Sequence, residues 1–253
     1  MIDAHAHLLS SQLDAKQIIN NMQSDGLEYI INVGTNVQDS QQGITLANSY
    51  NNVFTTVGLH PEYAQDITAQ DIMQIQDLAK QNKVVAIGEI GLDYHYGASD
   101  ELKKKQQEIF IAQIKIASKQ GLPIVIHCRD AVTDILDILK NNQQYLNNGF
   151  CMHCYSEGAT YVQDFINLGA YFSFTGNITF KKADRSFLKD IPQNKIMVET
   201  DCPYLSPEPF RGKLNTPKNV VYTAQKIADT LQMDLQAFLN IASQNTKTFF
   251  KIK

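Results

Sequence analysis

The 253-residue sequence has no basic excess, no long apolar run and few cysteines, and each absence excludes a class of protein. With a formal net charge of −4, it is poorly suited to wrap duplex DNA electrostatically. No run reaches about 18 apolar residues and no basic stretch precedes an apolar segment at the start, so we expect neither a membrane span nor a secretory signal. Four cysteines lie in or beside apolar runs, which predicts reduced thiols in a cytoplasmic protein: Cys128, Cys151, Cys154 and Cys202.

The apolar residues instead gather in eight strand-like runs that alternate with helix-like stretches. The strand-like runs are Ile2–His5, Tyr29–Gly34, Val53–Leu59, Val84–Glu89, Ile124–His127, Phe150–His153, Tyr171–Thr175 and Ile196–Asp201. The helix-like stretches are Asp14–Asp25, Asp39–Tyr50, Thr68–Asn82, Glu101–Gln120, Ala131–Lys140, Ala159–Leu168, Ala183–Leu188, Pro217–Leu231 and Leu235–Phe250. Alternating strands and helices with right-handed crossovers close into a barrel of parallel strands. We therefore predict one α/β domain over residues 1–253, a (β/α)8 TIM barrel.

Side chains of the kind that bind metals lie at the carboxyl ends of five of these runs. They are His5, His7, Glu89, His127, His153 and Asp201. Because the active sites of TIM barrels lie at the C-terminal face of the strands, the pattern predicts a metal centre there. The segment between Cys202 and Lys218 carries four of the seven prolines and is expected to form a stiff loop over the same face.

The sequence around the four histidines decides between metal binding and an ordinary surface or core position. His5 and His7 are two residues apart, so in a strand their imidazoles point to one side while Ala6 points to the other. An isolated HxH motif is more often a pair of surface histidines, but an apolar strand that carries both needs a reason to bury them. His127 and His153 would each be read as a core histidine alone. Their equivalent places on consecutive strands favour metal binding.

Glu89 and Asp201 bring carboxylates to the same end of the barrel. A buried carboxylate without a cation is costly, and one carboxylate can bridge two divalent ions. The alternative for Glu89 is a structural acid paired with Arg129 or a lysine. Asp201 could bind a metal and accept a proton from the attacking water, so Asp201 and Glu89 are the candidate catalytic residues. Glu199, two residues before Asp201, is expected to support the site from the barrel interior and not to bind metal.

These residues fall in motifs spread over nearly the whole chain. The motifs are Asp3–His7, Gly58–Pro61, Gly88–Tyr94, His127–Ala131, His153–Ser156, Glu199–Leu205 and Arg211–Lys213. In this order they resemble the TatD family of metal-dependent deoxyribonucleases, in the amidohydrolase superfamily. The motifs Gly88–Tyr94 and Glu199–Leu205 are the specific ones.

The resemblance implies a TIM barrel with two divalent ions and 3′–5′ exonuclease activity on single-stranded DNA, sometimes on RNA. It implies one ion held by His5, His7, Glu89 and Asp201, and a second held by Glu89, His127 and His153. Family members are described as Mg-dependent, but imidazole ligands suit Zn, Mn, Co or Ni better than Mg, so the identity of the ions stays open. Related hydrolases bridge their ions with a carboxylated lysine, a role that Glu89 takes here.

Three further residues are candidates for substrate binding. His60 matches a family position that faces the site. Arg129 and Arg211 could contact phosphate through planar guanidinium groups; for Arg129 an ion pair is an equal alternative, while for Arg211 we favour a functional role. His95 departs from the family pattern and is taken as a loop histidine. Three tyrosines could stack on bases or pack at the rim: Tyr94, Tyr155 and Tyr204.

Two other functions remain open for this sequence. Superfamily relatives cleave esters and amides, so a hydrolase of a small ester or amide is one alternative. A non-catalytic metal-dependent binding protein is the other, although such a protein would be expected to have lost Asp201 or Glu89. We expect a monomer, because no long exposed apolar stripe stands out.

Overall fold

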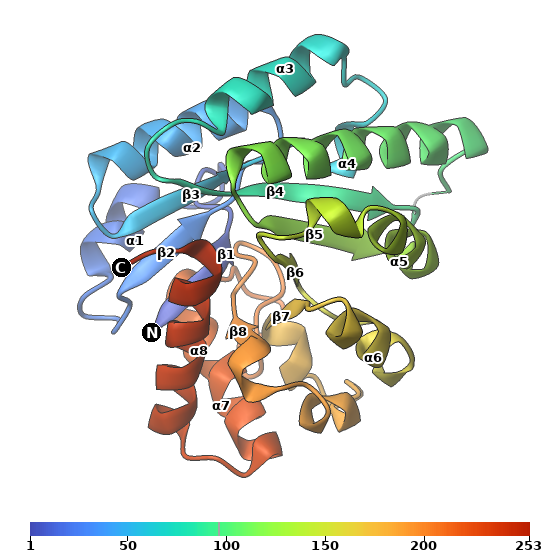
Figure 1. Cartoon of the computed structure of the whole chain (residues 1–253). Coiled ribbons are helices and arrows are strands. Elements are labelled where there is room, and N and C mark those ends of the chain that lie inside the picture. The colour runs from blue at the N-terminus through green and yellow to red at the C-terminus, as the bar shows by residue number, and fades with distance from the viewer. Residues whose placement is uncertain (96) are drawn as a thin grey trace.

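The computed structural model describes residues 1–95 and 97–253 as an eight-stranded parallel barrel with helices outside it (Figure 1). The strands pair in sequence order: β1 Ile2–Ala6, β2 Tyr29–Asn32, β3 Val53–Val57, β4 Val84–Asp93, β5 Ile124–Arg129, β6 Phe150–Met152, β7 Tyr171–Phe174 and β8 Ile196–Val198. The α-helices are α1 Ala15–Asn21, α2 Val37–Ser49, α3 Ala69–Leu78, α4 Asp100–Gln120, α5 Val132–Asn141, α6 Ala159–Asn167, α7 Val220–Leu231 and α8 Leu235–Phe250. The predicted TIM barrel is confirmed.

The barrel closes between β1 and β8 through a few specific contacts. Ala6 and Cys202 form a parallel bridge, and the amide of Asp201 donates to the carbonyl of His5 at 2.9 Å. Deeper in the barrel the buried carboxyl of Asp3 accepts from the Thr200 amide at 2.9 Å and lies 2.5 Å from the Thr200 hydroxyl. These contacts fix the segment that carries His5 against the segment that carries Asp201.

The core leaves the carboxyl ends of the strands available for a site. One large apolar cluster joins the strands to the surrounding helices. A smaller cluster contains Phe249, Phe250 and Ile252 from the end of the chain together with strand residues such as Ala4 and Met197. The two chain ends lie on the same side of the molecule in Figure 1, where the Tyr29 hydroxyl donates to the carbonyl of Lys253 at 2.9 Å.

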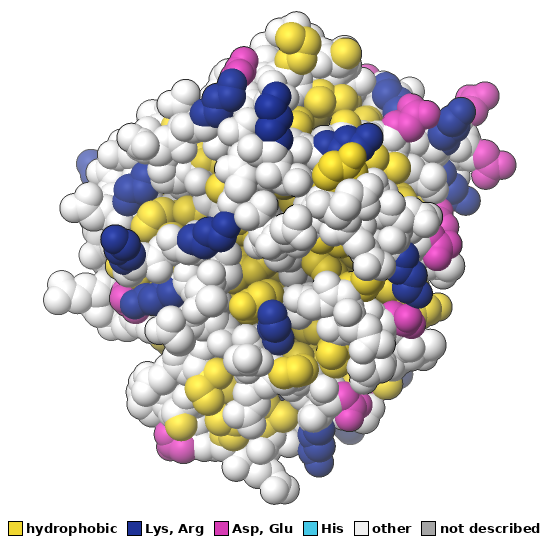
Figure 2. All heavy atoms as spheres, in the orientation of Figure 1, with side chains coloured by type: hydrophobic (Ala, Val, Ile, Leu, Met, Phe, Trp, Pro, Cys, Tyr) yellow, Lys and Arg dark blue, Asp and Glu magenta, His cyan; other side chains and the backbone are white. Residues whose placement is uncertain are grey.

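The surface in the orientation of Figure 1 carries scattered charges. Figure 2 shows lysine and arginine side chains interspersed with acidic ones, and no histidine is visible on this face. The four cysteines are free thiols. No helix within residues 1–95 and 97–253 has the length and apolar character needed to cross a membrane.

The helix predicted at Ala183–Leu188 is wrong. The connection from β7 to β8 contains only short 3-10 helices: η3 Gly176–Thr179, η4 Ser186–Lys189 and η5 Gln193–Lys195. The Asp184 carboxylate accepts from the Ser186 amide at 2.9 Å, and Arg185 donates from Nε to the carbonyl of Ile178 at 2.7 Å and from Nη2 to that of Phe180. Such bonds from side chains to nearby backbone compete with an α-helix.

Candidate metal centre

Glu89 on β4 lies at the centre of a cluster of buried imidazoles. Its Oε1 atom is 2.8 Å from Nδ1 of His127, 2.8 Å from Nε2 of His153 and 3.4 Å from Nε2 of His60. The three histidines come from the ends of different strands, and the Glu89 side chain is 4% exposed. One carboxylate oxygen therefore faces three ring nitrogens in the barrel mouth.

The other oxygen of Glu89 faces the opposite group. Its Oε2 atom is 3.4 Å from Nε2 of His5 and 3.8 Å from Nε2 of His7. The same two nitrogens lie 3.5 Å and 3.2 Å from Oδ1 of Asp201. Glu89 thus stands between two sets of donor atoms, with a different oxygen turned toward each set.

The burial of His5 tests whether a cation fits here. The side chain is fully buried, yet neither ring nitrogen has a hydrogen-bond partner among the described residues. A buried polar atom without a partner costs about 1–3 kcal/mol. A divalent ion near Nε2 would satisfy that nitrogen and also the oxygens of Glu89 and Asp201 beside it. The donor set of imidazoles and carboxylates fits a transition-metal ion such as Zn or Mn.

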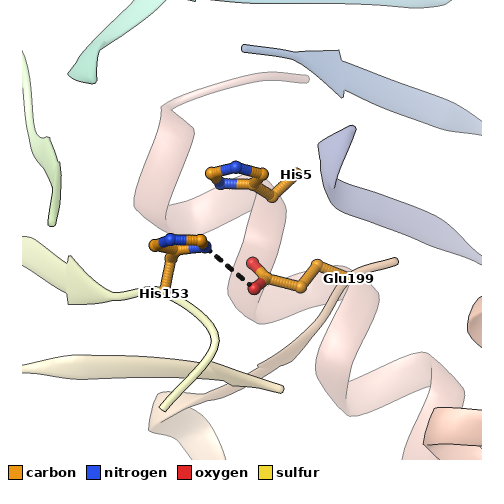
Figure 3. A group of neighbouring side chains, drawn as sticks. All are labelled: His5, His153 and Glu199. Carbon is orange, nitrogen blue, oxygen red and sulfur yellow. Dashed lines mark hydrogen bonds and ion pairs between the residues drawn. The ribbon is translucent and has the colours of Figure 1, made fainter. Parts of the chain in front are cut away.

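The two histidines nearest Oε1 of Glu89, His127 and His153, form what we call the Oε1 side, and the histidines facing Oε2 form the Oε2 side. On the Oε1 side, each imidazole has an acid at its second ring nitrogen. Nε2 of His127 is 3.0 Å from Oδ2 of Asp93, and Nδ1 of His153 is 3.2 Å from Oε1 of Glu199. Figure 3 shows the Glu199 carboxylate directed at His153, with the His5 ring stacked on the same imidazole. A carboxylate on the second nitrogen fixes the orientation of a metal-binding histidine.

Glu199 also belongs to a group of three side chains close enough to hold an ion, with His5 and His153. Its oxygens are already occupied, however. Oε1 accepts from the Cys154 amide at 2.7 Å, and Oε2 accepts from the hydroxyl of Ser173. These contacts favour an orienting role for Glu199.

Asp93 has a contact that the sequence analysis missed. It lies four residues after Glu89, at the last position of β4, and is the register partner of Arg129 on β5. The alternation of residues along a strand could have placed it on the same face as Glu89. Its role depends on the direction of the His127 ring, which no sequence pattern encodes.

The cluster keeps its carboxylates ionised. Burial alone would disfavour the charged form of Glu89, but the imidazoles of His153 and His60 hold the pKa of this carboxyl well below its usual value. For Asp201, the hydrogen bond from His7 likewise outweighs burial and lowers the pKa. Burial lowers the pKa of His5, which favours the neutral imidazole. Neighbouring carboxylates outweigh burial and raise the pKa values of the other three imidazoles, which are His7, His127 and His153. Because ionised carboxylates and neutral imidazoles are the forms that bind metal ions, binding would displace protons from these three rings.

His60 differs from the other imidazoles in its hydrogen bonds. Its Nδ1 atom accepts from the amide of Glu62 at 3.1 Å, which places the ring proton on Nε2. That nitrogen is the one that faces Glu89. His60 therefore presents a donor to the cluster, as suits a residue that contacts a substrate oxygen.

The two candidate arginines lie in different places. Arg129, at the end of β5, lines the same cavity as the cluster, a volume of 1120 Å³. Its charge contributes to a lowered pKa of Asp93. Arg211 lies in an adjoining cavity, with its guanidinium carbon 4.2 Å from the centre of the Phe180 ring.

Only one of the three tyrosines is free to meet a ligand at the cluster. Tyr204 is 55% exposed and its ring centre lies 6.2 Å from that of His7. Tyr155 is buried and donates to the carbonyl of Gly158, while the hydroxyl of Tyr94 donates to Asp134. His95 lies on the loop with Nδ1 2.7 Å from Oδ2 of Asp130.

Comparisons with known proteins agree with one another. A model of the family described as TatD related DNase matches residues 2–251. The uncharacterized metal-dependent hydrolase YabD of Bacillus subtilis is 37% identical over 256 residues, covering 100% of this chain and 99% of the relative. The 3′-5′ ssDNA/RNA exonuclease TatD of Escherichia fergusonii is 32% identical, again over 100% of this chain and 99% of the relative. A solved structure, the TatD homologue YjjV of Escherichia coli K12, has a TM-score of 0.92 at 25% identity, covering 100% of this chain and 98% of that one.

Proposed function

We propose, from the premise that the chain belongs to the TatD-related DNase family and is a metal-dependent hydrolase, that it removes nucleotides from the 3′ end of single-stranded DNA or RNA. The relative named as a 3′-5′ ssDNA/RNA exonuclease supports this choice of bond. We further propose that the protein acts as a monomer in the cytoplasm. The observation that carries the proposal is the position of Glu89, with one oxygen toward each of two donor sets.

The proposed ligands follow from those two sets. Oε1 of Glu89, Nδ1 of His127 and Nε2 of His153 would hold one ion. Oε2 of Glu89, both imidazoles of the HxH motif and Oδ1 of Asp201 would hold the other: His5 and His7. When bound, two divalent ions lower the pKa of water and offset charge on the attacked phosphate.

The chain's own residues supply the remaining steps. Asp201 is held ionised by His7, so it can accept a proton from the attacking water through its carboxylate. His60 donates from Nε2 to an oxygen of the bound phosphate, since its Nδ1 is occupied by the Glu62 amide. Asp93 and Glu199 keep the imidazoles of the Oε1 side from rotating.

Replacing Asp201 with Asn tests the proposal. The variant should keep its circular dichroism spectrum but lose cleavage of 5′-labelled single strands by at least about 10²-fold, because a general base contributes about 10²–10⁴-fold. The wild-type protein, loaded with Mg, Mn or Zn, should shorten free oligonucleotides and spare those blocked at the 3′ end.

Three outcomes would overturn this assignment. Wild-type-like turnover by the Asp201→Asn variant would remove the proposed base. Turnover of small esters or amides without cleavage of any oligonucleotide would favour the amidohydrolase alternative. Bound metal with no turnover of either class would favour a binding protein.

A further inference from the structure

A second cavity adjoins the metal centre and is not explained by the chemistry above. It has a volume of 570 Å³ and shares two lining residues, Ser156 and Asn177, with the metal-centre cavity. Its walls come from the segments after β6 and β7 and from the Pro-rich segment after β8. A molecule bound at the metal centre could therefore continue into this second cavity.

Basic side chains outnumber acidic ones by three to one in the lining of the second cavity. Lys181 and Lys182 are exposed on the segment after η3, and Arg211 is exposed on the Pro-rich segment. None of the three forms an ion pair with an acid within the part of the chain that the structure describes. The single lining acid, Asp184, is engaged by the amide and hydroxyl of Ser186 at 2.9 Å and 2.8 Å. Three cations thus remain available to a negatively charged ligand.

The two segments that carry the three cations are joined by a hydrogen bond. The amide of Glu208 on the Pro-rich segment donates to the hydroxyl of Thr179 in η3 at 2.8 Å. Arg185 donates to the carbonyls of Ile178 and Phe180 and so fixes the backbone next to Lys181. These contacts give the cavity a defined shape without a ligand.

An aromatic side chain supports the arginine. The guanidinium of Arg211 lies over the ring of Phe180, with its central carbon 4.2 Å from the ring centre. Contact with the ring limits the movement of the guanidinium, and a phosphate can accept from two of its N–H groups. A cation fixed in this way is better suited to a phosphodiester than a freely rotating lysine is.

We propose that this cavity binds the part of a single strand that lies on the 5′ side of the scissile bond, through backbone phosphates held by Lys181, Lys182 and Arg211. The proposal rests on the proposed function. If the 3′ nucleotide lies at the metal centre, the rest of the strand leaves on its 5′ side. The shared lining residues Ser156 and Asn177 mark the path by which it reaches the cations. The cavity would then make affinity depend on strand length.

A charge-removal variant tests this with substrates of two lengths. In Lys181→Gln/Lys182→Gln, the KM for a single-stranded 10-mer should rise about tenfold with kcat unchanged, since two phosphate contacts are lost. The KM for a dinucleotide, too short to reach the cavity, should stay within about twofold of wild type. The slope of log KM against log salt for the 10-mer should fall by about 0.7 for each contact removed. Arg211→Gln, on the other segment, should give the same length-dependent loss.

A matched control removes equal charge elsewhere. Lys16→Gln/Lys119→Gln changes two exposed lysines on α1 and α4 that line neither cavity, and it should behave as wild type on both substrates. Anisotropy of a labelled phosphorothioate 10-mer, measured for all variants, separates binding from turnover. If the wild type cleaves the 10-mer and the Lys181→Gln/Lys182→Gln variant matches it in KM and affinity, the inference is wrong and the proposed function stands. If the wild type neither binds nor cleaves single strands, the proposed function fails, and the inference with it.

Discussion

The two sides of Glu89 differ in how their histidines are held. On the Oε1 side, His127 and His153 each have a carboxylate on the second ring nitrogen. On the Oε2 side, His5 has no hydrogen bond to either ring nitrogen among the described residues; its carbonyl accepts from the Asp201 amide and its ring stacks on His153. The first side is therefore oriented by side chains, while the second depends on barrel closure and on what binds there.

Different contacts position the histidines on the two sides of Glu89. Side-chain support fixes a ring even when no ion is present, so the Oε1 side is expected to be preorganised. The closure contacts of β1 and β8 bring His5 to Asp201 but leave its ring nitrogens unsatisfied. A bound ion is therefore expected to stabilise the Oε2 side more than the Oε1 side.

Replacing Glu89 with Gln would remove a carboxylate ligand from both proposed ion positions at once. We expect it to cause the largest loss of bound metal and of hydrolysis. An amide is a weaker metal ligand than a carboxylate, and its NH₂ group would face imidazoles that now face an oxygen. Bound metal, measured by elemental analysis after dialysis, should fall at both positions, and hydrolysis should fall by at least about 10³-fold, as for loss of a metal-bridging group. Glu108→Gln, a change at an exposed acid on α4 that lines neither cavity, serves as the control. Full metal content in Glu89→Gln would show that Glu89 does not bridge.

Replacing Glu199 with Gln should disturb only the Oε1 side, and so tests whether the two ion positions are independent. The amide would remove the charge that orients His153, and loss of such a supporting carboxylate typically costs about 10–100-fold in metal affinity. In metal titrations, one ion should bind more weakly than it does to the wild type, and the other should bind with unchanged affinity. Equal weakening of both events would mean that the two sides are not independent.

Sequence patterns predicted the barrel and the identity of the clustered residues, because both depend on local order. Apolar runs mark buried parallel strands; His153 follows β6 directly, and Asp201 lies three residues after the end of β8. The support of His127 by Asp93 was not predicted, because it depends on a ring direction. The separation of Arg211 from the metal centre was not predicted either, because the course of a Pro-rich loop has no periodic signal. The helix expected at Ala183–Leu188 failed because Asp184 and Arg185 bond to backbone instead.

Replacing Asp3 with Asn would test the contacts between β1 and β8 that position the Oε2 side. Of the three replacements, we expect this one to have the smallest effect on the metal centre. Burial raises the pKa of Asp3 to about 8, although hydrogen bonds from Thr200 oppose this shift. An acid whose pKa is higher in the folded state binds more protons when folded. The free energy of unfolding therefore falls as pH rises from the ordinary carboxyl pKa, about 4, towards 8.

Asn resembles the protonated acid, since its NH₂ group can donate to the Thr200 hydroxyl while its oxygen accepts from the Thr200 amide. In chelator-treated protein, the Tm of Asp3→Asn relative to wild type should therefore increase between pH 5 and pH 8.5. Each pH unit between the two pKa values changes the free energy of unfolding by about 1.4 kcal/mol, about 4 kcal/mol over this range. Since about 1 kcal/mol shifts Tm by about 2–4 °C in a domain of this size, the increase should be about 8–16 °C. Asp66→Asn, a change at an acid remote from the closure, should show no such trend. A Tm difference that stays constant over this range would mean that Asp3 is ionised in the folded protein, and that the β1–β8 closure contains a charged hydrogen bond rather than a neutral one.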